Sequence, residues 1–60
     1  MEIKIDTPTI RKLIGKKVKF KLKNSSWEQT GTIEDIINKQ ININGDWISF
    51  NGFSKIVLIE

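Results

Sequence analysis

The chain has 60 residues, a net charge of +3 and neither cysteine nor histidine. This length accommodates one small domain, over residues 1–60, with a modest hydrophobic core. The composition excludes disulfide bonds, thiolate or imidazole metal ligands, and Cys–His or Ser–His catalysis. We therefore expect neither a metal nor any other cofactor.

The acidic residues do not indicate an enzyme. Glu34 and Asp35 are neighbours in a predicted strand, so their side chains point to opposite faces and cannot form a paired acid–base site. The sequence also lacks the glycine-rich phosphate loops of nucleotide-binding enzymes. We expect a binding protein.

The sequence carries no membrane signal. No segment approaches the run of about 20 apolar residues that spans a bilayer. Glu2 and Asp6 give the first residues an acidic character unlike that of a signal peptide. We expect a cytoplasmic protein without membrane contact.

The first predicted elements are a short strand and a short helix. Residues 2–5 alternate between polar and apolar side chains, which predicts a strand with Ile3 and Ile5 inward. Asp6 or Thr7 then offers an N-cap oxygen. A proline follows at position 8, where the first helical turn tolerates it, and a glycine at position 15 favours the left-handed end of a helix.

The predicted helix has one apolar face and one basic face. Ile10, Leu13 and Ile14 share a face at helical spacing, so we expect about two turns that cover one opening of the core. Arg11 and Lys12 point away from that face.

Residues 16–23 alternate between basic and apolar side chains, which predicts a strand. One face carries Lys17, Lys19, Lys21 and Lys23. The other face carries Val18, Phe20 and Leu22.

A turn at residues 24–27 leads into a second predicted strand, residues 28–37. If Asn24 faces Trp27, Phe20 lies opposite Gly31, which leaves room for the aromatic ring. The predicted cross-strand partners of the lysines are Lys23 with Glu28, Lys21 with Thr30, Lys19 with Thr32, and Lys17 with Glu34. Lys19 and Lys21 then form a central pair that faces neutral side chains.

A third turn at residues 38–39 precedes a predicted hairpin. Asn44-Gly45 lies between two alternating segments, and this pair favours a type I′ turn because both residues accept positive φ. In the resulting register Ile41 faces Ile48, and Trp47 lies on the outer side. A short connection at residues 51–52 then leads into the last strand.

The C-terminal run is apolar at every position: Ile56, Val57, Leu58 and Ile59. A strand with one face in water alternates, so the second face of this run needs a cover. Either the helix or the first strand covers it, or the run forms a homo-oligomer interface.

A short helix followed by five consecutive strands, with Val18-x-Phe20-x-Leu22 and then Gly31-x-Ile33, resembles the small SH3-like barrels. This group includes Sm-like, Tudor-like and KOW-type modules. The resemblance implies a mainly β fold: a small barrel of five to six antiparallel strands with one short N-terminal helix. The Sm-like proteins are closest in element order, which implies a ring that binds RNA. Their Arg-Gly pair before the last strand is Asn51-Gly52 here, so no binding residue is carried over.

The distribution of charge favours an anionic partner. Residues 1–23 carry a net charge of +6 and residues 24–60 a net charge of −3, and such asymmetry steers association. Lysines on one strand face are about 7 Å apart, close to twice the roughly 3.4 Å axial spacing of phosphates along one DNA strand. We predict a DNA- or RNA-binding accessory protein with the contact residues Arg11, Lys12, Lys16, Lys17, Lys19, Lys21, Trp27 and Trp47.

Two other interpretations stay open at this point. Lysines on the wet face of a strand also prevent aggregation, and Trp27 and Trp47 can serve the fold alone. Alternatively, the chain is a protein-interaction or inhibitor module, of phage or mobile-element origin, that directs its lysines at an acidic protein partner. Its small size and its many isoleucines, lysines and asparagines, typical of an AT-rich genome, are compatible with the latter.

Overall fold

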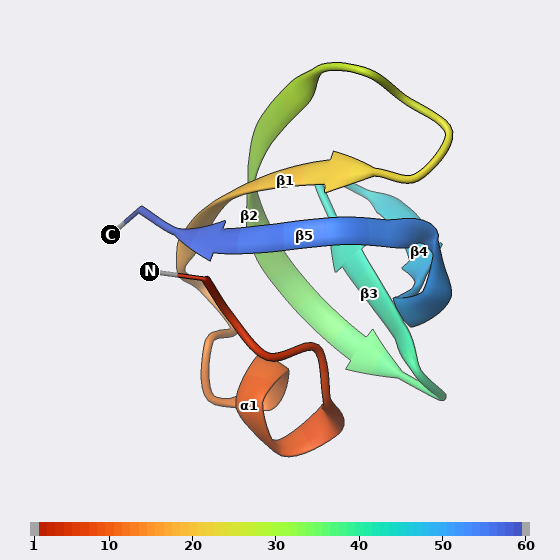
Figure 1. The fold of residues 1–60 in the computed structure, drawn as a ribbon. Helices are drawn as coiled ribbons and strands as arrows, with labels where there is room; N and C mark the ends of the chain where they lie inside the picture. Colours follow the sequence, from red (N-terminus) through yellow and green to blue (C-terminus); the bar gives the residue numbers. More distant parts are fainter. Residues whose placement is uncertain (1, 60) are drawn as a thin grey trace.

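The computed structural model describes residues 2–59, so Met1 and Glu60 of the predicted domain lie outside it. A short helix precedes five strands, and one 3₁₀ turn interrupts them before the last strand (Figure 1). The elements are α1 (Thr7–Arg11), β1 (Lys17–Leu22), β2 (Glu28–Ile37), β3 (Gln40–Ile43), β4 (Asp46–Ser49), the 3₁₀ turn η1 (Phe50–Gly52) and β5 (Phe53–Leu58). The prediction of a mainly β chain with a short N-terminal helix is confirmed.

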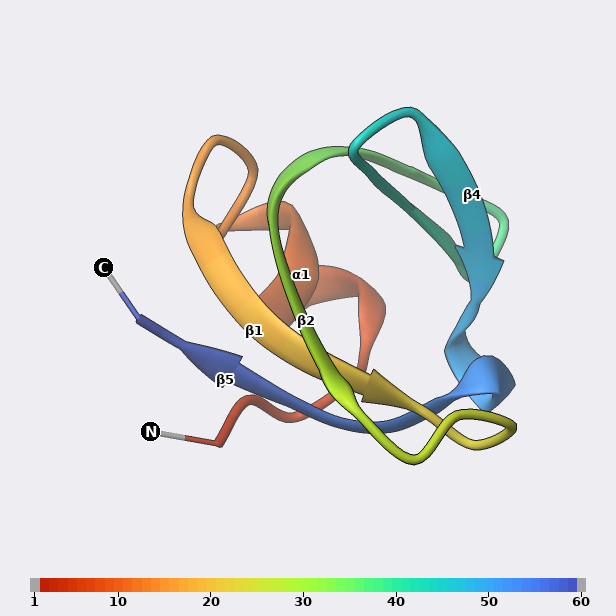
Figure 2. The same cartoon turned by 90° about the horizontal axis from the view of Figure 1, so that it is seen from above.

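The five strands form one antiparallel sheet in the order β4-β3-β2-β1-β5. β2 belongs to both halves of this sheet, because its first residues pair with β1 and its last residues pair with β3. The register with β3 shifts between Ile33 and Asp35, which identifies a β-bulge at Glu34. Bulges bend the strand that carries them. The strands therefore fold into two layers, with β1 and β5 on one side of the core and β4 on the other (Figure 2).

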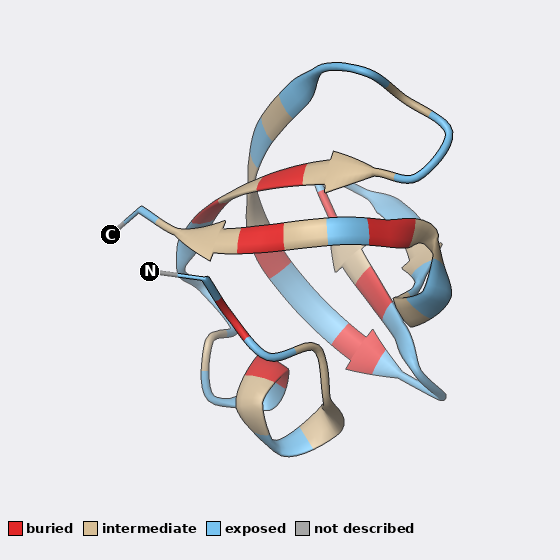
Figure 3. Cartoon of the chain, viewed as in Figure 1, coloured by how far each residue is buried: buried red, intermediate tan, exposed pale blue. Residues whose placement is uncertain are grey.

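The core lies between these layers. Rings of Phe20 and Phe53 pack edge to face, with centroids 5.8 Å apart. Ile10 is fully buried and brings α1 over one open end of the layers (Figures 1 and 3). Within residues 2–59 the buried hydrophobic side chains are Ile3, Ile10, Val18, Phe20, Ile33, Ile36, Ile41, Ile43, Phe53 and Ile56. Burial of each such side chain stabilises the fold by about 1.5–3 kcal/mol.

The predicted first strand is reduced to a single bridge. Glu2 pairs with Val57, and the N–H of Ile3 donates to the carbonyl of Ile56 at 2.8 Å. Ile3 is buried as predicted, while Ile5 is half-buried. This segment runs along the outer edge of β5 and so covers part of the apolar C-terminal run; Ile59 remains 44% exposed.

The helix begins as predicted but is shorter. Asp6 caps it, since the N–H of Thr9 donates to Asp6 Oδ1 at 2.9 Å. The helix ends at Arg11, and turns carry the chain to Gly15, which has the predicted positive φ of 91°. The expectation that Ile14 faces inward is wrong, because it is 41% exposed. The shorter helix allows the N–H of Gly15 to donate to the carbonyl of Ile33 at 2.7 Å.

The predicted pairing of β1 with β2 is wrong by two residues. The structure places Lys17 opposite Thr32, Lys19 opposite Thr30 and Lys21 opposite Glu28. A shift by two residues keeps every side chain on its predicted face, so alternation does not distinguish the two registers. Hydrogen bonds of the loop fix the register that is observed. The N–H of Ser25 donates to the carbonyl of Leu22, and the N–H of Lys23 donates to the carbonyl of Gly52 in η1.

The two tight turns agree with the prediction. Asn44 and Gly45 have φ values of 57° and 87°, as a type I′ turn requires. Asn38 and Lys39 have φ values of 51° and 61° and join β2 to β3. The predicted partners across the second hairpin, Ile41 with Ile48 and Asn42 with Trp47, are also confirmed.

Gly31 allows β3 to approach β2 closely. It lies opposite Val18, whereas Phe20 lies opposite Gln29, so the predicted packing of Phe20 over the glycine is wrong. The space is filled instead by Ile43 and Asn44: a Cβ on Gly31 would lie 2.6 Å from Ile43 Cγ2 and 2.8 Å from Asn44 Cγ. Ile43 is buried, so its side chain cannot move away from an added Cβ without displacing its neighbours in the core.

We expect Gly31→Ala to lower the free energy of unfolding by about 1–3 kcal/mol, the usual cost of overpacking. Urea denaturation followed by tryptophan fluorescence measures it. The double variant Gly31→Ala, Asn44→Gly should recover part of the loss, because it removes one of the two clashing side chains and retains a permissive turn residue. An unchanged denaturation midpoint for Gly31→Ala would contradict this account of the close approach.

Candidate functional site

The alternating lysines of β1 lie in the middle of a three-stranded layer. β1 lies between β2 and β5. The register places Lys21 of β1 next to Lys55 of β5. Val57 lies next to Lys19 and is half-buried. We call this surface the lysine face, and its cationic members are Lys17, Lys19, Lys21 and Lys55.

One carboxylate lies at the end of the lysine face. Glu28 is opposite Lys21, and its Oε2 lies 3.1 Å from Lys55 Nζ. The hydrogen bond from Lys55 and then its charge lower the pKa of Glu28, and the charges of Lys19 and Lys21 lower it further. Three lysines of the face therefore act on this one carboxylate. The positive charge is reduced at the Lys21 end, whereas Lys19 lies opposite Thr30.

Trp27 is an exposed aromatic residue in the loop that leads into β2. Trp27 is in the loop between β1 and β2, immediately before Glu28, and it is 63% exposed. Its N–H makes a long contact of 3.4 Å with Ser25 Oγ, so the loop is folded back on itself without covering the indole. The ring is therefore accessible, in the loop that directly precedes Glu28.

The other predicted contact residues are not part of the lysine face. The carbonyl of Lys16 accepts from Ile33 and extends the ladder, but its side chain has the parity of Val18 rather than of Lys17. Arg11 lies on α1 and Lys12 caps it, both exposed. Two strands, β2 and β3, separate β1 from β4, which carries Trp47.

Lys55 was not predicted as a contact residue. Phe53 and Ile56 are both buried although they are three positions apart, because the pairing with β1 shifts between Lys21 and Leu22. Strict alternation from Phe53 would have directed Lys55 inward. The only sequence signal for its true position is its place next to Ile56, the first residue of the C-terminal apolar run.

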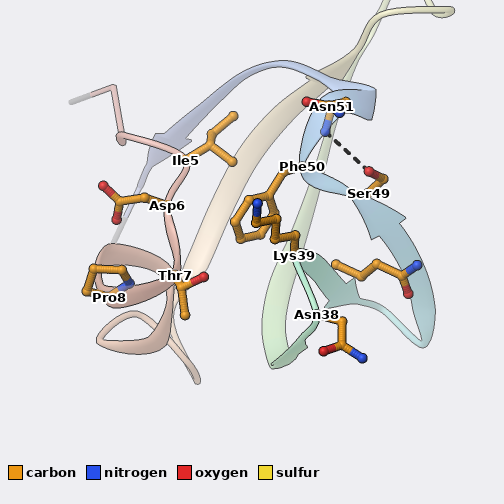
Figure 4. Close-up of a pocket in the computed structure, with 10 residues that line it drawn as sticks. Ile5, Asp6, Thr7, Pro8, Asn38, Lys39, Ser49, Phe50 and Asn51 are labelled. Atoms are coloured by element: carbon orange, nitrogen blue, oxygen red, sulfur yellow. Dashed lines mark hydrogen bonds between the residues drawn. The ribbon is translucent and has the colours of Figure 1, made fainter.

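A separate groove of about 780 Å³ lies at the end of the molecule near α1 (Figure 4). It is lined by residues 5–8, 38–40 and 49–51. Phe50 and Ile5 contribute apolar surface, and the N–H of Phe50 donates to the carbonyl of Lys39 at 2.9 Å. The carboxylate in the lining, Asp6, is engaged: it caps α1, lies 3.7 Å from Lys4, and has a pKa lowered chiefly by its hydrogen bonds with Thr9. None of the predicted contact residues lines this groove.

Within residues 2–59, no group of three or more acidic side chains is arranged to hold a metal ion, and no helix is long and apolar enough to cross a membrane. The structure offers two surfaces for a partner, the lysine face with Trp27 and the groove.

No family model, curated protein or solved structure matches the chain.

The electrostatics of the lysine face can be measured through Glu28. We expect its pKa, followed by NMR of the side-chain carboxyl carbon, to lie below the ordinary value of 4.5, and Lys55→Gln to raise it. A lowered pKa in the folded state means that the ion pair stabilises the fold above pH 4.5, and that this contribution is lost as the pH falls through the lowered value. Lys12→Gln, which removes a charge outside the surroundings of Glu28, is the control. An unchanged Glu28 pKa in Lys55→Gln would refute the ion pair.

Proposed function

We propose that the chain is a small cytoplasmic nucleic-acid-binding protein that contacts the phosphate backbone through the lysine face. The observation that supports this most directly is the position of β1 between β2 and β5. β1 is hydrogen-bonded to a strand on each side, so the spacing of its lysines is already fixed in the unbound protein. Binding then does not have to order the backbone beneath the charges.

The lysine face extends in two directions. Along β1, successive outward lysines are about 7 Å apart, and the step from β1 to β5 is about 4.8 Å. Lys55 therefore widens the face beside Lys21. Because Glu28 offsets one positive charge at that end, we expect about three phosphates to be neutralised, chiefly around Lys17, Lys19 and Lys21.

Trp27 favours a single strand as the ligand. Its indole is exposed in the loop that joins β1 to β2, and an unpaired base can stack on it there. Bases in a duplex already stack on each other and offer no free face. Trp47 is on a different surface and plays no part in this contact.

We further propose that the fold is a small SH3-like barrel. The strand order and the bend of β2 at Glu34 support this architecture. Strands that change layers at a bulge are typical of two short sheets packed at a steep angle. Closure would bring the edge strands β4 and β5 together around η1.

A second candidate function is binding to an acidic protein. The half-buried Val57 among the lysines and the exposed Trp27 give the lysine face apolar contact points of the kind that anchor protein interfaces. An inhibitor of phage or mobile-element origin would use the face in this way. Binding that persists after nuclease treatment, together with no affinity for nucleic acid at low salt, would favour this candidate.

The proposed function predicts a specific salt dependence. For single-stranded DNA, log K should fall with log salt with a slope of about −0.7 for each phosphate contacted. The double variant Lys19→Gln, Lys21→Gln removes two contacts, so we expect weaker binding and a slope shallower by about 1.4. Fluorescence anisotropy of a labelled oligonucleotide measures both quantities. In Trp47→Phe, quenching of the remaining Trp27 emission reports stacking directly.

A matched control removes the same charge elsewhere. Lys4→Gln, Lys39→Gln changes two exposed lysines that lie outside the lysine face, and it should leave the slope nearly unchanged. Equal losses in the two double variants would show that net charge alone causes binding. Absence of binding to single- and double-stranded DNA and RNA at low salt would refute the proposed function.

Glu28→Gln should strengthen binding. The substitution removes the carboxylate and releases Lys55, so we expect a higher affinity and a slope steeper by about 0.7, equivalent to one more phosphate. Glu34→Gln removes the same charge from the β2 bulge, and its effect should be smaller. The idea fails if the two variants behave alike or if Glu28→Gln binds more weakly.

A further inference from the structure

A second surface, on the outer side of β3, β4 and the last part of β2, carries exposed apolar side chains. Ile37 is 51% exposed and Trp47 is 46% exposed. Both point outward: Ile37 pairs with Gln40, and Trp47 pairs with Asn42, while the inward partners across this hairpin are Ile41 and Ile48. This location contrasts with the usual burial of large apolar residues in a small core.

Asp46 pairs with the inward Ile43, so it does not share the side of β4 that carries Trp47. Two carboxylates of β2 lie closer to these apolar side chains. Asp35 lies in the same row as Trp47, separated from it by Asn42.

Ile33 and Ile36 are both buried although they are three positions apart, so the exposed Glu34 and Asp35 both lie outward at the bulge. The expectation that they point to opposite faces is wrong, because the bulge interrupts the alternation of β2. We call this surface the tryptophan face, and its members are Glu34, Asp35, Ile37 and Trp47.

Among residues 2–59, no ion pair involves a carboxylate of the tryptophan face. The ion pairs seen among residues 2–59 join Lys4 with Asp6 and Lys55 with Glu28. Asp35 accepts a hydrogen bond from the N–H of Ile36 at 2.8 Å through Oδ1, which leaves its other oxygen open. The tryptophan face therefore combines unpaired negative charge with exposed apolar surface.

The lysine face has the complementary composition. Its half-buried Val57 lies between Lys19 and Glu2, with Lys55 on the same strand, and the two faces lie on opposite layers of the molecule (Figure 2). We propose that the tryptophan face of one copy binds the lysine face of a second copy. Carboxylates then meet lysines, Ile37 and Trp47 lose water, and a lysine can lie over the electron-rich indole.

This arrangement is head-to-tail. An open assembly of this kind has an unoccupied lysine face at one end and an unoccupied tryptophan face at the other end. Further copies can therefore add at both ends. The lysine face is also the surface proposed for phosphate binding, so a second copy and a nucleic acid compete for it. The contact requires no nucleic acid, and the experiment is therefore done in its absence, where failure of the proposed function does not affect the result.

Sedimentation velocity of the full chain over a range of protein and salt concentrations tests the proposal. At low salt, we expect the average mass to rise with protein concentration beyond that of a dimer, and to return to the monomer at high salt because exposed charges are screened. Two variants reverse one face each: Glu34→Lys, Asp35→Lys on the tryptophan face and Lys19→Glu, Lys21→Glu on the lysine face. Each variant alone should remain monomeric.

Mixing the two variants should restore association, because the intact lysine face of the first meets the intact tryptophan face of the second. Adding Trp47→Ala to the lysine-face variant should weaken this mixed complex, which separates docking from general attraction between a basic and an acidic protein. Circular dichroism shows whether each variant is folded. A wild-type monomer at low salt, a mass that stops at two copies, or association that persists in both single-face variants would overturn the proposal.

Discussion

The bend of β2 is the constraint on which the rest of the structure depends. This ten-residue strand pairs with β1 over its first half and with β3 over its second half, and the bulge at Glu34 interrupts the second ladder after its first pair. A short chain has few strands with which to enclose a core. Sharing one strand between two layers lets Ile33 and Ile36 contact side chains from both layers. Gly31 completes the arrangement, because its missing Cβ is the space that Ile43 occupies.

The same bend separates the two outer surfaces. The lysine face belongs to the layer of β1 and β5, and the tryptophan face belongs to the layer of β3 and β4. The charge asymmetry of the sequence thus becomes a charge asymmetry in space. Glu28 brings a negative charge from residues 24–60 into the basic layer, since it starts β2 there and pairs with Lys55. Its lowered pKa reflects that position.

The sequence predicted the elements that depend on local signals. Asp6 and Pro8 placed the start of the helix, Asn44-Gly45 placed the hairpin turn, and alternation in β1 placed its lysines outward. Predictions failed where distant contacts decide. Lys55 faces outward because of a shift in pairing with β1, and the lysines of β1 have partners two residues away from those expected.

The sequence by itself determined which side chains of β1 point to water, because the period of a strand is two and the apolar residues must be buried. It did not determine the register, since a shift by two residues preserves every face. Only the tertiary structure decided that Lys21 rather than Lys23 meets Glu28, that Lys55 joins the lysines, and that Trp47 lies on the other layer. These positions follow from loop contacts and bulges that join distant segments, and no local pattern encodes them.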